Sequence, residues 1–230
     1  MKTREIKSTK DFLEAVESMS SSLPIYRGQG RAEWKLMPRI GRVFHFRPFI
    51  DKAGKPERVF EEELVALEDF KRRAIPFIQK LPEDNWQWLA LAQHHGLPTR
   101  LLDWTENPLA AAFFAAYDQH IGDSAIYVLD RKGIGIGRKS ESPFSLTETK
   151  LFEPSHLTPS ITAQAGLFTV HHRPEQEYEN DLLEKWVLRE ACLIQLASKV
   201  ESFGVNYQTL FPSLDGLAKH LMHRFLLYER

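Results

Sequence analysis

In the first half of the chain, segments whose apolar residues have helical spacing alternate with short apolar segments typical of strands. Apolar positions at helical spacing predict a helix over residues 8–18, capped by Ser8 or Thr9. A short strand over 25–28 is expected next, running into a glycine turn. A long helix over 57–74 follows, ended by Pro76, and its apolar stripe consists of Phe60, Leu64, Leu67 and Phe70.

The middle of the chain combines two further helices with two extended segments. Asn85 is expected to cap the first of these helices, and residues 99–105 are expected to be extended. Pro108 suits the first turn of a helix over 109–117. Because that helix is apolar on all sides, it is expected to be buried, next to a central strand over 125–129.

The second half of the chain is less regular. The pattern predicts a loop over 133–160, strands over 162–170 and 185–188, and helices over 191–202 and 213–228. The residues of the last helix that are expected to face inward are Leu214, Leu217, Leu221 and Phe225. Since strands and helices mix without regular alternation, we predict the α+β class, with a mixed sheet of short strands packed by helices in a single domain over 1–230.

Composition narrows the class of protein. The 230 residues are 43% hydrophobic, which excludes an intrinsically disordered chain. Thirty Lys and Arg balance 31 Asp and Glu, so no global field attracts nucleic acid or an anionic membrane. No apolar run reaches the roughly 20 residues that span a bilayer, and the single Cys192 requires no oxidising compartment. The expected location is the cytoplasm.

Some familiar patterns carry little chemistry in this chain. The glycines of residues 133–137 lack the spacing of a dinucleotide-binding loop, and no helix is predicted after them. The pairs His94-His95 and His171-His172 are adjacent in sequence, so the two rings of a pair do not face each other on a helix or strand. No metal site is predicted, because no carboxylate or cysteine has the flanking spacing of a zinc ligand set.

A basic segment over 29–47 mixes arginines with aromatic residues, and we expect it to be irregular. It suits phosphate recognition, but a solvated surface loop is the more economical interpretation. Arg27 differs because it lies within the apolar strand over 25–28. A guanidinium buried there needs an anionic or carbonyl partner, supplied by an internal carboxylate such as Asp103 or by a bound anion.

A second polar cluster covers residues 93–108, between two apolar helices. Such a density of amide, imidazole, hydroxyl and charged groups near a core indicates a functional site or a buried hydrogen-bond network. Asp103 is the predicted carboxylate partner of either Arg27 or Arg100. Gln164 is a further polar residue isolated among small and apolar neighbours.

These segments resemble the FRG domain family, which is named for a Phe-Arg-Gly near its start. Here Tyr26 takes the place of the Phe, and the likeness runs over about residues 8–222. The segments that carry it are Tyr26-Arg27-Gly28-Gln29 with Trp34, Leu36 and Pro38, then residues 91–110, Ala163-Gln164-Ala165-Gly166-Leu167-Phe168-Thr169, and residues 210–217.

The order of motifs in this family looks like a divergent ADP-ribosyltransferase arrangement, an analogy at the level of fold. It implies that Arg27 binds the nicotinamide ribose or the pyrophosphate of NAD, and that Thr105 or Thr99 supports the NAD-binding wall. Gln164 would hold the position of the catalytic acid. The remaining residues that the resemblance assigns to NAD binding are Gly28, Gln93, His94, His95 and Arg100.

Two functions therefore stand as expectations. In the first, the chain is an NAD-dependent transferase or glycohydrolase that acts on an unknown acceptor in a toxin or phage-defence setting. Breaking the nicotinamide bond passes through an oxocarbenium-like state, so Asp103 or Glu106 would have to supply the charge that Gln164 lacks. This function predicts that Arg27, Gln93, Arg100, Asp103, Thr105 and Gln164 converge on one cleft.

In the second, the chain is a non-catalytic module that binds a nucleotide, a nucleic acid or a protein. The same residues then form a structural network. This function predicts that Arg27 is closed off by Asp103 or Glu106, with no open pocket beside it.

Overall fold

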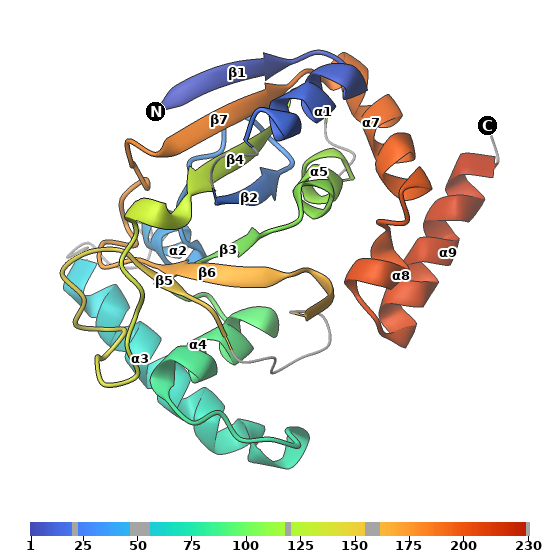
Figure 1. Ribbon diagram of the computed structural model, residues 1–230. Helices are drawn as coiled ribbons and strands as arrows, with labels where there is room; N and C mark the ends of the chain where they lie inside the picture. Colours follow the sequence, from blue (N-terminus) through green and yellow to red (C-terminus); the bar gives the residue numbers. More distant parts are fainter. Residues whose placement is uncertain (20–22, 47–55, 118–120, 155–161, 229–230) are drawn as a thin grey trace.

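A computed structural model describes residues 1–19, 23–46, 56–117, 121–154 and 162–228 (Figure 1). The strands are β1 (Lys2–Ile6), β2 (Pro24–Gln29), β3 (Leu101–Thr105), β4 (Ser124–Asp130), β5 (Lys150–Phe152), β6 (Gly166–Val170) and β7 (Leu183–Leu188). The α-helices are α1 (Thr9–Glu17), α2 (Arg39–Phe46), α3 (Pro56–Ala74), α4 (Asn85–His94), α5 (Pro108–Ala116), α7 (Glu190–Ser202), α8 (Tyr207–Leu210) and α9 (Leu214–Tyr228), with short 3-10 turns at Ile75–Phe77 and Arg131–Gly133. The predicted α+β class is confirmed.

The strands of the described chain form one mixed sheet in the order β1-β7-β4-β2-β3-β6-β5. β1 pairs with β7 in parallel, and the other named pairs are antiparallel. β2 and β4 share a register of six residue pairs, whereas β2 and β3 share only Tyr26 with Thr105. The sheet therefore opens between β2 and β3, and Arg27 and Asp103 lie on the open side of that single pair.

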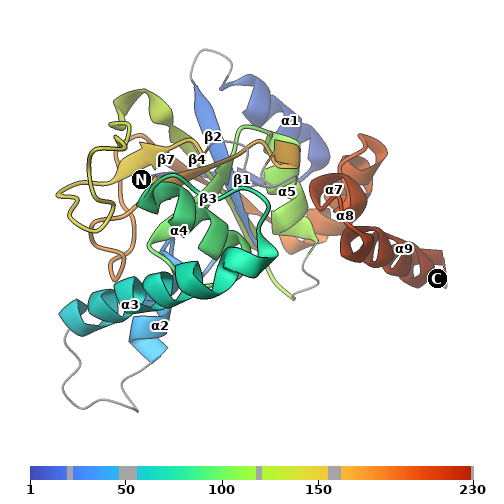
Figure 2. The same ribbon diagram turned by 90° about the horizontal axis from the view of Figure 1, so that it is seen from below.

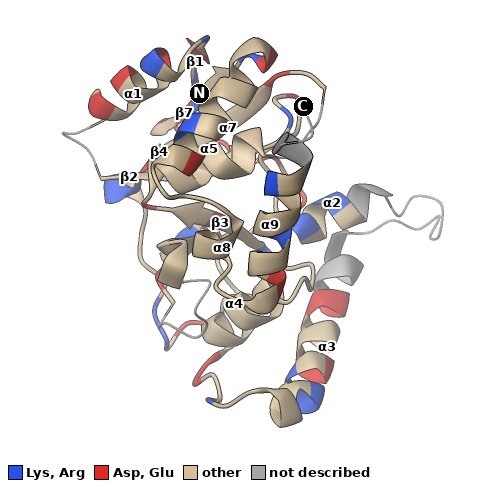
Figure 3. Cartoon of the chain, turned by 90° about the vertical axis from the view of Figure 1, so that its right-hand side faces the viewer, with Lys and Arg blue, Asp and Glu red and all other residues tan. Residues whose placement is uncertain are grey.

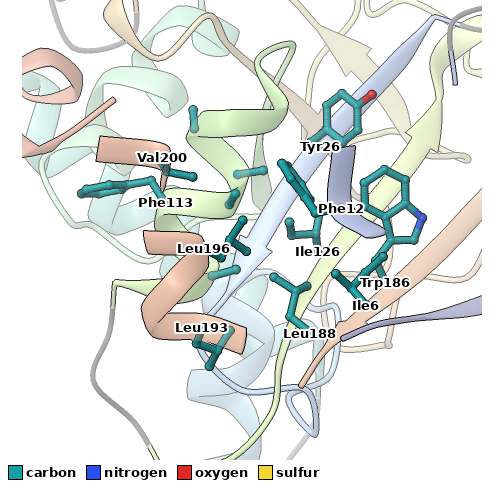
Figure 4. Packing of buried hydrophobic residues seen from close by; sticks show 14 of the residues in the cluster. Ile6, Phe12, Tyr26, Phe113, Ile126, Trp186, Leu188, Leu193, Leu196 and Val200 are labelled. Atoms are coloured by element: carbon teal, nitrogen blue, oxygen red, sulfur yellow. The ribbon is translucent and has the colours of Figure 1, made fainter. Parts of the chain in front are cut away.

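Each half of the sheet has its own layer of helices (Figures 1 and 2). α1, α5 and α7 pack on the half that contains β2, β4 and β7, around an apolar cluster that includes Phe12, Tyr26, Phe113 and Trp186 (Figure 4). α3 and α4 pack on the other half through Leu67, Leu89 and Phe168. This burial supplies most of the driving force for each layer.

A third apolar cluster joins the two halves of the sheet. It combines Ile25 and Tyr127 from one half with Leu102, Trp104 and Leu167 from the other. These residues lie on strand faces that alternate with the helix-covered faces, as the two-residue period of a strand requires. The two half-sheets thus enclose a common core beside the opening between β2 and β3.

Several boundaries follow from helix caps. Ser8 caps α1, and its side chain accepts a hydrogen bond from the N–H of Asp11. Asn107 caps α5 with Pro108 as the first helical residue, as predicted. The expected cap of α4 is wrong by one residue, because Asp84 accepts from the N–H of Gln87 while Asn85 is already helical.

Three further expectations differ from the structure. The segment over 29–47 is not irregular throughout, because Arg39–Phe46 form α2. The predicted strand over 162–170 begins only at Gly166, and Gln164 lies in the preceding turn. The stripe of α3 is also incomplete, because Leu67 is buried while Leu64 is exposed.

The last helix has the opposite orientation to the one expected. Of the four residues expected to face inward, Leu214, Leu221 and Phe225 are exposed, Phe225 to 72%, and only Leu217 is half-buried. Gly216 and His220 of this helix are buried instead. In Figure 3, which faces this side of the molecule, most of α8 and α9 carries no charged residue. No helix in the described part of the chain is long and apolar enough to cross a membrane.

Candidate functional site

A small cavity of about 130 Å³ lies where the sheet opens between β2 and β3. It is lined by Arg27 of β2, Leu101 and Asp103 of β3, Arg39 and Arg42 of α2, Gln93 of α4 and Leu97. Three guanidinium groups and one carboxylate thus face one space. The arrangement combines two strands with the beginning of one helix and the end of another.

Arg27 is held by β3 through two acceptors of the same residue. Its Nη1 donates to the backbone oxygen of Asp103 at 2.8 Å and to the carboxylate Oδ2 at 3.2 Å. The Arg27 side chain is 15% exposed, and the Asp103 side chain is 56% exposed. The Nε–H of Arg27 is buried and has no hydrogen-bond partner among the described residues. Asp103 is therefore the predicted partner of Arg27, but it does not satisfy the whole guanidinium.

A short chain of hydrogen bonds orients Gln93 in the cavity. The buried Thr99 hydroxyl donates to Gln93 Oε1 at 2.6 Å, which leaves the amide nitrogen to face β3. That nitrogen donates to the Leu101 carbonyl at 3.2 Å and to Asp103 Oδ2 at 3.1 Å. Thr99 thus positions Gln93, and Gln93 in turn holds the Asp103 carboxylate.

Helix α2 supplies two more arginines to the cavity. Arg39 and Arg42 are three residues apart, so their side chains leave the same face of the helix. Arg39 Nη1 donates to the Gly96 carbonyl at 3.0 Å, whereas the buried Nε–H of Arg42 has no partner among the described residues. Desolvation lowers the pKa of Arg42, and repulsion from Arg27 and Arg39 lowers it further, with Asp103 acting in the opposite direction.

Two histidines end α4 near this cavity. His94 and His95 are exposed, and their ring centroids lie 5.1 Å apart. Desolvation lowers the pKa of His94, His95 lowers it further, and Asp103 acts in the opposite direction. His94 therefore shares the electrostatic environment of Asp103, although neither histidine belongs to the cavity lining.

Arg100 lies apart from the cavity, in a buried ion pair that the sequence analysis did not predict. Its Nη2 and Nε donate to Glu63 Oε2 at 2.7 and 2.9 Å, and its backbone N–H donates to Glu63 Oε1 at 2.7 Å. The side chains are only 4% and 1% exposed. The expectation that Asp103 pairs with Arg27 or Arg100 is resolved in favour of Arg27.

The remaining polar candidates gather at the other end of β3. The Thr105 hydroxyl donates to the Gln164 carbonyl at 2.5 Å, and the Gln164 amide donates to the Leu210 carbonyl at 3.1 Å. Glu106 pairs with Arg131 at 2.7 Å. These contacts tie the turn before β6 to β3 and to α8, and none of these residues lines the cavity.

Gly28 serves close packing between β2 and α5. A Cβ at this position would lie 2.0 Å from the Ala111 carbonyl oxygen and 2.7 Å from the Ala115 nitrogen. Only glycine lets the strand approach the helix so closely. The structure therefore places Gly28 against the helix layer and outside the cavity lining.

Each of the two expected arrangements is met in part. Arg27, Gln93 and Asp103 converge on one cavity, whereas Arg100, Thr105 and Gln164 do not join them. The Arg27–Asp103 ion pair forms, and an open cavity nevertheless lies beside it. The structure thus combines the Arg27–Asp103 ion pair with an open cavity whose positive charge is only partly neutralised.

Arg39 and Arg42 lie in the basic segment for which phosphate recognition was considered, but they were not predicted as site residues, and Glu63 was not singled out. The three-residue spacing of Arg39 and Arg42 after Pro38 was the available signal for a helix that presents both side chains together. Glu63 belongs to the acidic run Glu61-Glu62-Glu63 of α3, and nothing in that run distinguishes the buried carboxylate from its exposed neighbours.

Comparison with known proteins identifies one related family model. No curated protein and no solved structure matches the chain. Residues 22–124 match the family model described as the FRG domain. This segment contains all seven residues that line the cavity. The match to the FRG domain therefore covers a little under half of the chain.

Proposed function

We propose that this domain is a recognition module that binds the phosphate group of a small phosphorylated molecule, a nucleotide by class. The observation that carries the proposal is the meeting of Arg27, Arg39 and Arg42 around one cavity, with Asp103 as the only carboxylate among the described lining residues. Arginine presents a planar fork of donors that matches phosphate oxygens in geometry and in charge.

The energetics of the cationic cavity support an anionic ligand. The buried Nε–H groups of Arg27 and Arg42 have no acceptor among the described residues, and a buried donor without an acceptor costs about 1–3 kcal/mol. Repulsion among the three arginines adds to this cost. A bound phosphate would accept hydrogen bonds from the guanidinium groups that line the cavity and neutralise the excess charge.

Binding is better supported than cleavage of NAD. An oxocarbenium-like state requires a carboxylate beside it. Asp103 is the only carboxylate that lines the cavity among the described residues, and its Oδ2 already accepts from Arg27 and Gln93. The Gln164 amide is bound to Leu210, and Glu106 is paired with Arg131. Neither is available in the cavity to assist the reaction.

The test is calorimetric titration of the full chain with inorganic phosphate, together with thermal unfolding in its presence. We expect phosphate to bind the native protein and to raise its unfolding temperature, since a ligand of the folded state stabilises it. Arg42→Gln should abolish both effects. Because it removes a desolvated charge that is repelled by its neighbours, it should leave the phosphate-free protein as stable as the native one or more stable.

The matched control is Arg72→Gln. Arg72 is an exposed arginine of α3 that pairs with Asp69, outside the cavity. This variant should retain the full phosphate effect. Equal binding by native protein and Arg42→Gln, or no binding by the native protein, would refute the proposal. A parallel incubation with labelled NAD tests the enzymatic alternative, which requires nicotinamide release that is lost in Arg27→Gln.

A further inference from the structure

The charge and size of the cavity restrict which phosphate it can take. Resting on the function proposed above, we infer that its ligand enters by a terminal phosphate monoester, and not by the bridging phosphates of a dinucleotide or a nucleic acid strand. Charge, volume and the number of available oxygens each favour this class of ligand.

The net charge of the lining matches a dianion. Arg27, Arg39 and Arg42 contribute three positive charges and Asp103 one negative charge, so the lining carries 3 − 1 = 2 positive charges. A phosphate monoester carries about −1.5 to −2 at pH 7, because its second pKa is about 6. A bridging phosphate carries a single negative charge. Among ligands that place a single phosphate group in the cavity, only the monoester approaches neutralisation of the lining.

The volume of the cavity admits one such group. The cavity volume is about 130 Å³. Pockets that enclose a whole drug-sized ligand hold about 300–1,000 Å³. The phosphate therefore enters the cavity while the rest of the ligand remains outside. A bridging phosphate has a substituent on each side, and both substituents would need a way out of this small space.

The side chains that line the cavity also favour a terminal phosphate as the end of the ligand. Leu97 and Leu101 contribute apolar surface with no hydrogen bond to offer to a sugar or a second phosphate. The polar donors are the three guanidinium groups and the Gln93 amide, whose nitrogen already donates to Leu101 and Asp103. A terminal phosphate presents three non-bridging oxygens to such donors, whereas a bridging phosphate presents two.

Calorimetric titration of the full chain at pH 7.5 tests the inference with AMP, NAD and dimethyl phosphate. AMP supplies a terminal monoester on an adenosine, NAD supplies bridging phosphates on the same adenosine, and dimethyl phosphate is a small monoanionic diester. We expect AMP to bind at least about tenfold more tightly than NAD, on the scale of one close charge interaction. Dimethyl phosphate should show no heat of binding.

A second arm varies the charge of the ligand itself. Between pH 7.5 and 5.5 AMP regains its second proton, so its affinity should fall, while sulfate keeps both charges and reports any titration of the protein. The charged and titratable groups at the cavity are Arg27, Arg39, Arg42 and Asp103 of the lining, with His94 close to Asp103. An affinity for AMP that changes with pH only as much as that for sulfate would contradict the inference.

The outcomes separate this inference from the proposed function. If NAD binds as tightly as AMP and Arg42→Gln abolishes the binding of both, the cavity is a phosphate site but the terminal-phosphate inference is wrong. If inorganic phosphate, AMP and NAD all fail to bind the native protein, both are refuted. Tight binding of AMP that survives Arg42→Gln also refutes both, because the ligand then lies elsewhere.

Discussion

Replacing Glu63 by Gln is the sharpest test of what the buried Glu63–Arg100 pair does for stability. The substitution keeps the shape of the side chain and one oxygen acceptor, but it removes the negative charge. The guanidinium of Arg100, 4% exposed, then stays buried with Phe144 4.7 Å from it and the Pro143 carbonyl 3.3 Å away. Neither of these two groups carries a negative charge.

The expected loss follows from this burial. Removing one partner of a buried ion pair costs about 3–5 kcal/mol, against a total stability of about 5–15 kcal/mol for a typical domain. For a chain of this size each kcal/mol lowers the unfolding temperature by about 2–4 °C, so Glu63→Gln should lower it by about 6–20 °C.

Urea unfolding should show the same loss as a lower midpoint at an unchanged slope. The companion variant replaces both Glu63 and Arg100 by Met, which removes both charges while keeping apolar volume. It should recover most of the stability lost in Glu63→Gln, because both charges of the pair are removed together. A loss below about 1 kcal/mol for Glu63→Gln, or a double variant less stable than the single one, would refute this explanation of the pair.

Three further changes have defined outcomes. Asp103→Asn should tighten the binding of inorganic phosphate by about tenfold, because it removes a negative charge that repels the phosphate while the backbone carbonyl of residue 103 still holds Arg27. Calorimetry measures this affinity, with Asp69→Asn as the control. Weaker binding by Asp103→Asn would contradict the prediction. Gly28→Ala should cost about 3 kcal/mol or more in urea unfolding, since its Cβ would lie 2.0 Å from the Ala111 oxygen, and native stability would show that the strand can move away. Burial lowers the pKa of His171 from 6.5 to about 3, so the unfolded chain binds more protons than the folded chain between these pH values. The stability present above pH 6.5 should therefore decline as the pH falls towards 3. His171→Gln should flatten this decline when the free energy of unfolding is measured at pH 7.5 and 4.5. An equally steep decline in that variant would show that other groups cause it.

The elements predicted correctly are those whose local pattern agrees with their tertiary surroundings. α5 is apolar on all sides and is buried, and β4 is a continuous apolar run inside the sheet. α2 was missed because arginines and Gly41 interrupt its pattern. A long-range contact explains that glycine, since a Cβ at Gly41 would lie 1.8 Å from the Pro174 carbonyl oxygen.

The error in α9 has a different cause. Helical spacing correctly grouped Leu214, Leu221 and Phe225 on one face, but periodicity does not state which face meets the body of the protein. The protein packs the face that bears Gly216 and His220, where a Cβ on Gly216 would lie 1.8 Å from the Phe211 oxygen. Only the tertiary structure supplies that choice.

The candidate site was predicted in outline because its central requirement is chemical. A guanidinium in an apolar strand needs an acceptor, and that requirement predicted an internal carboxylate such as Asp103, or a bound anion, beside Arg27. The contributions of Arg39 and Arg42 required a helix that was not expected. The separate location of Arg100 depends on how α3 packs relative to β3, and no local sequence pattern predicts that packing.

The pairing of β1 with β7 has a consequence for synthesis of the chain on the ribosome. Lys2 is opposite Glu184, so the two partners are 184 − 2 = 182 residues apart. At a translation rate of about 5–20 residues per second, β7 is synthesised on the order of ten seconds or more after β1. β2 and β3 are complete much earlier, whereas their neighbours in the sheet, β4 and β6, end only at Asp130 and Val170. The nascent chain therefore carries all the residues that line the cavity, the last of them Asp103, while the outer edges of β2 and β3 are still unpaired.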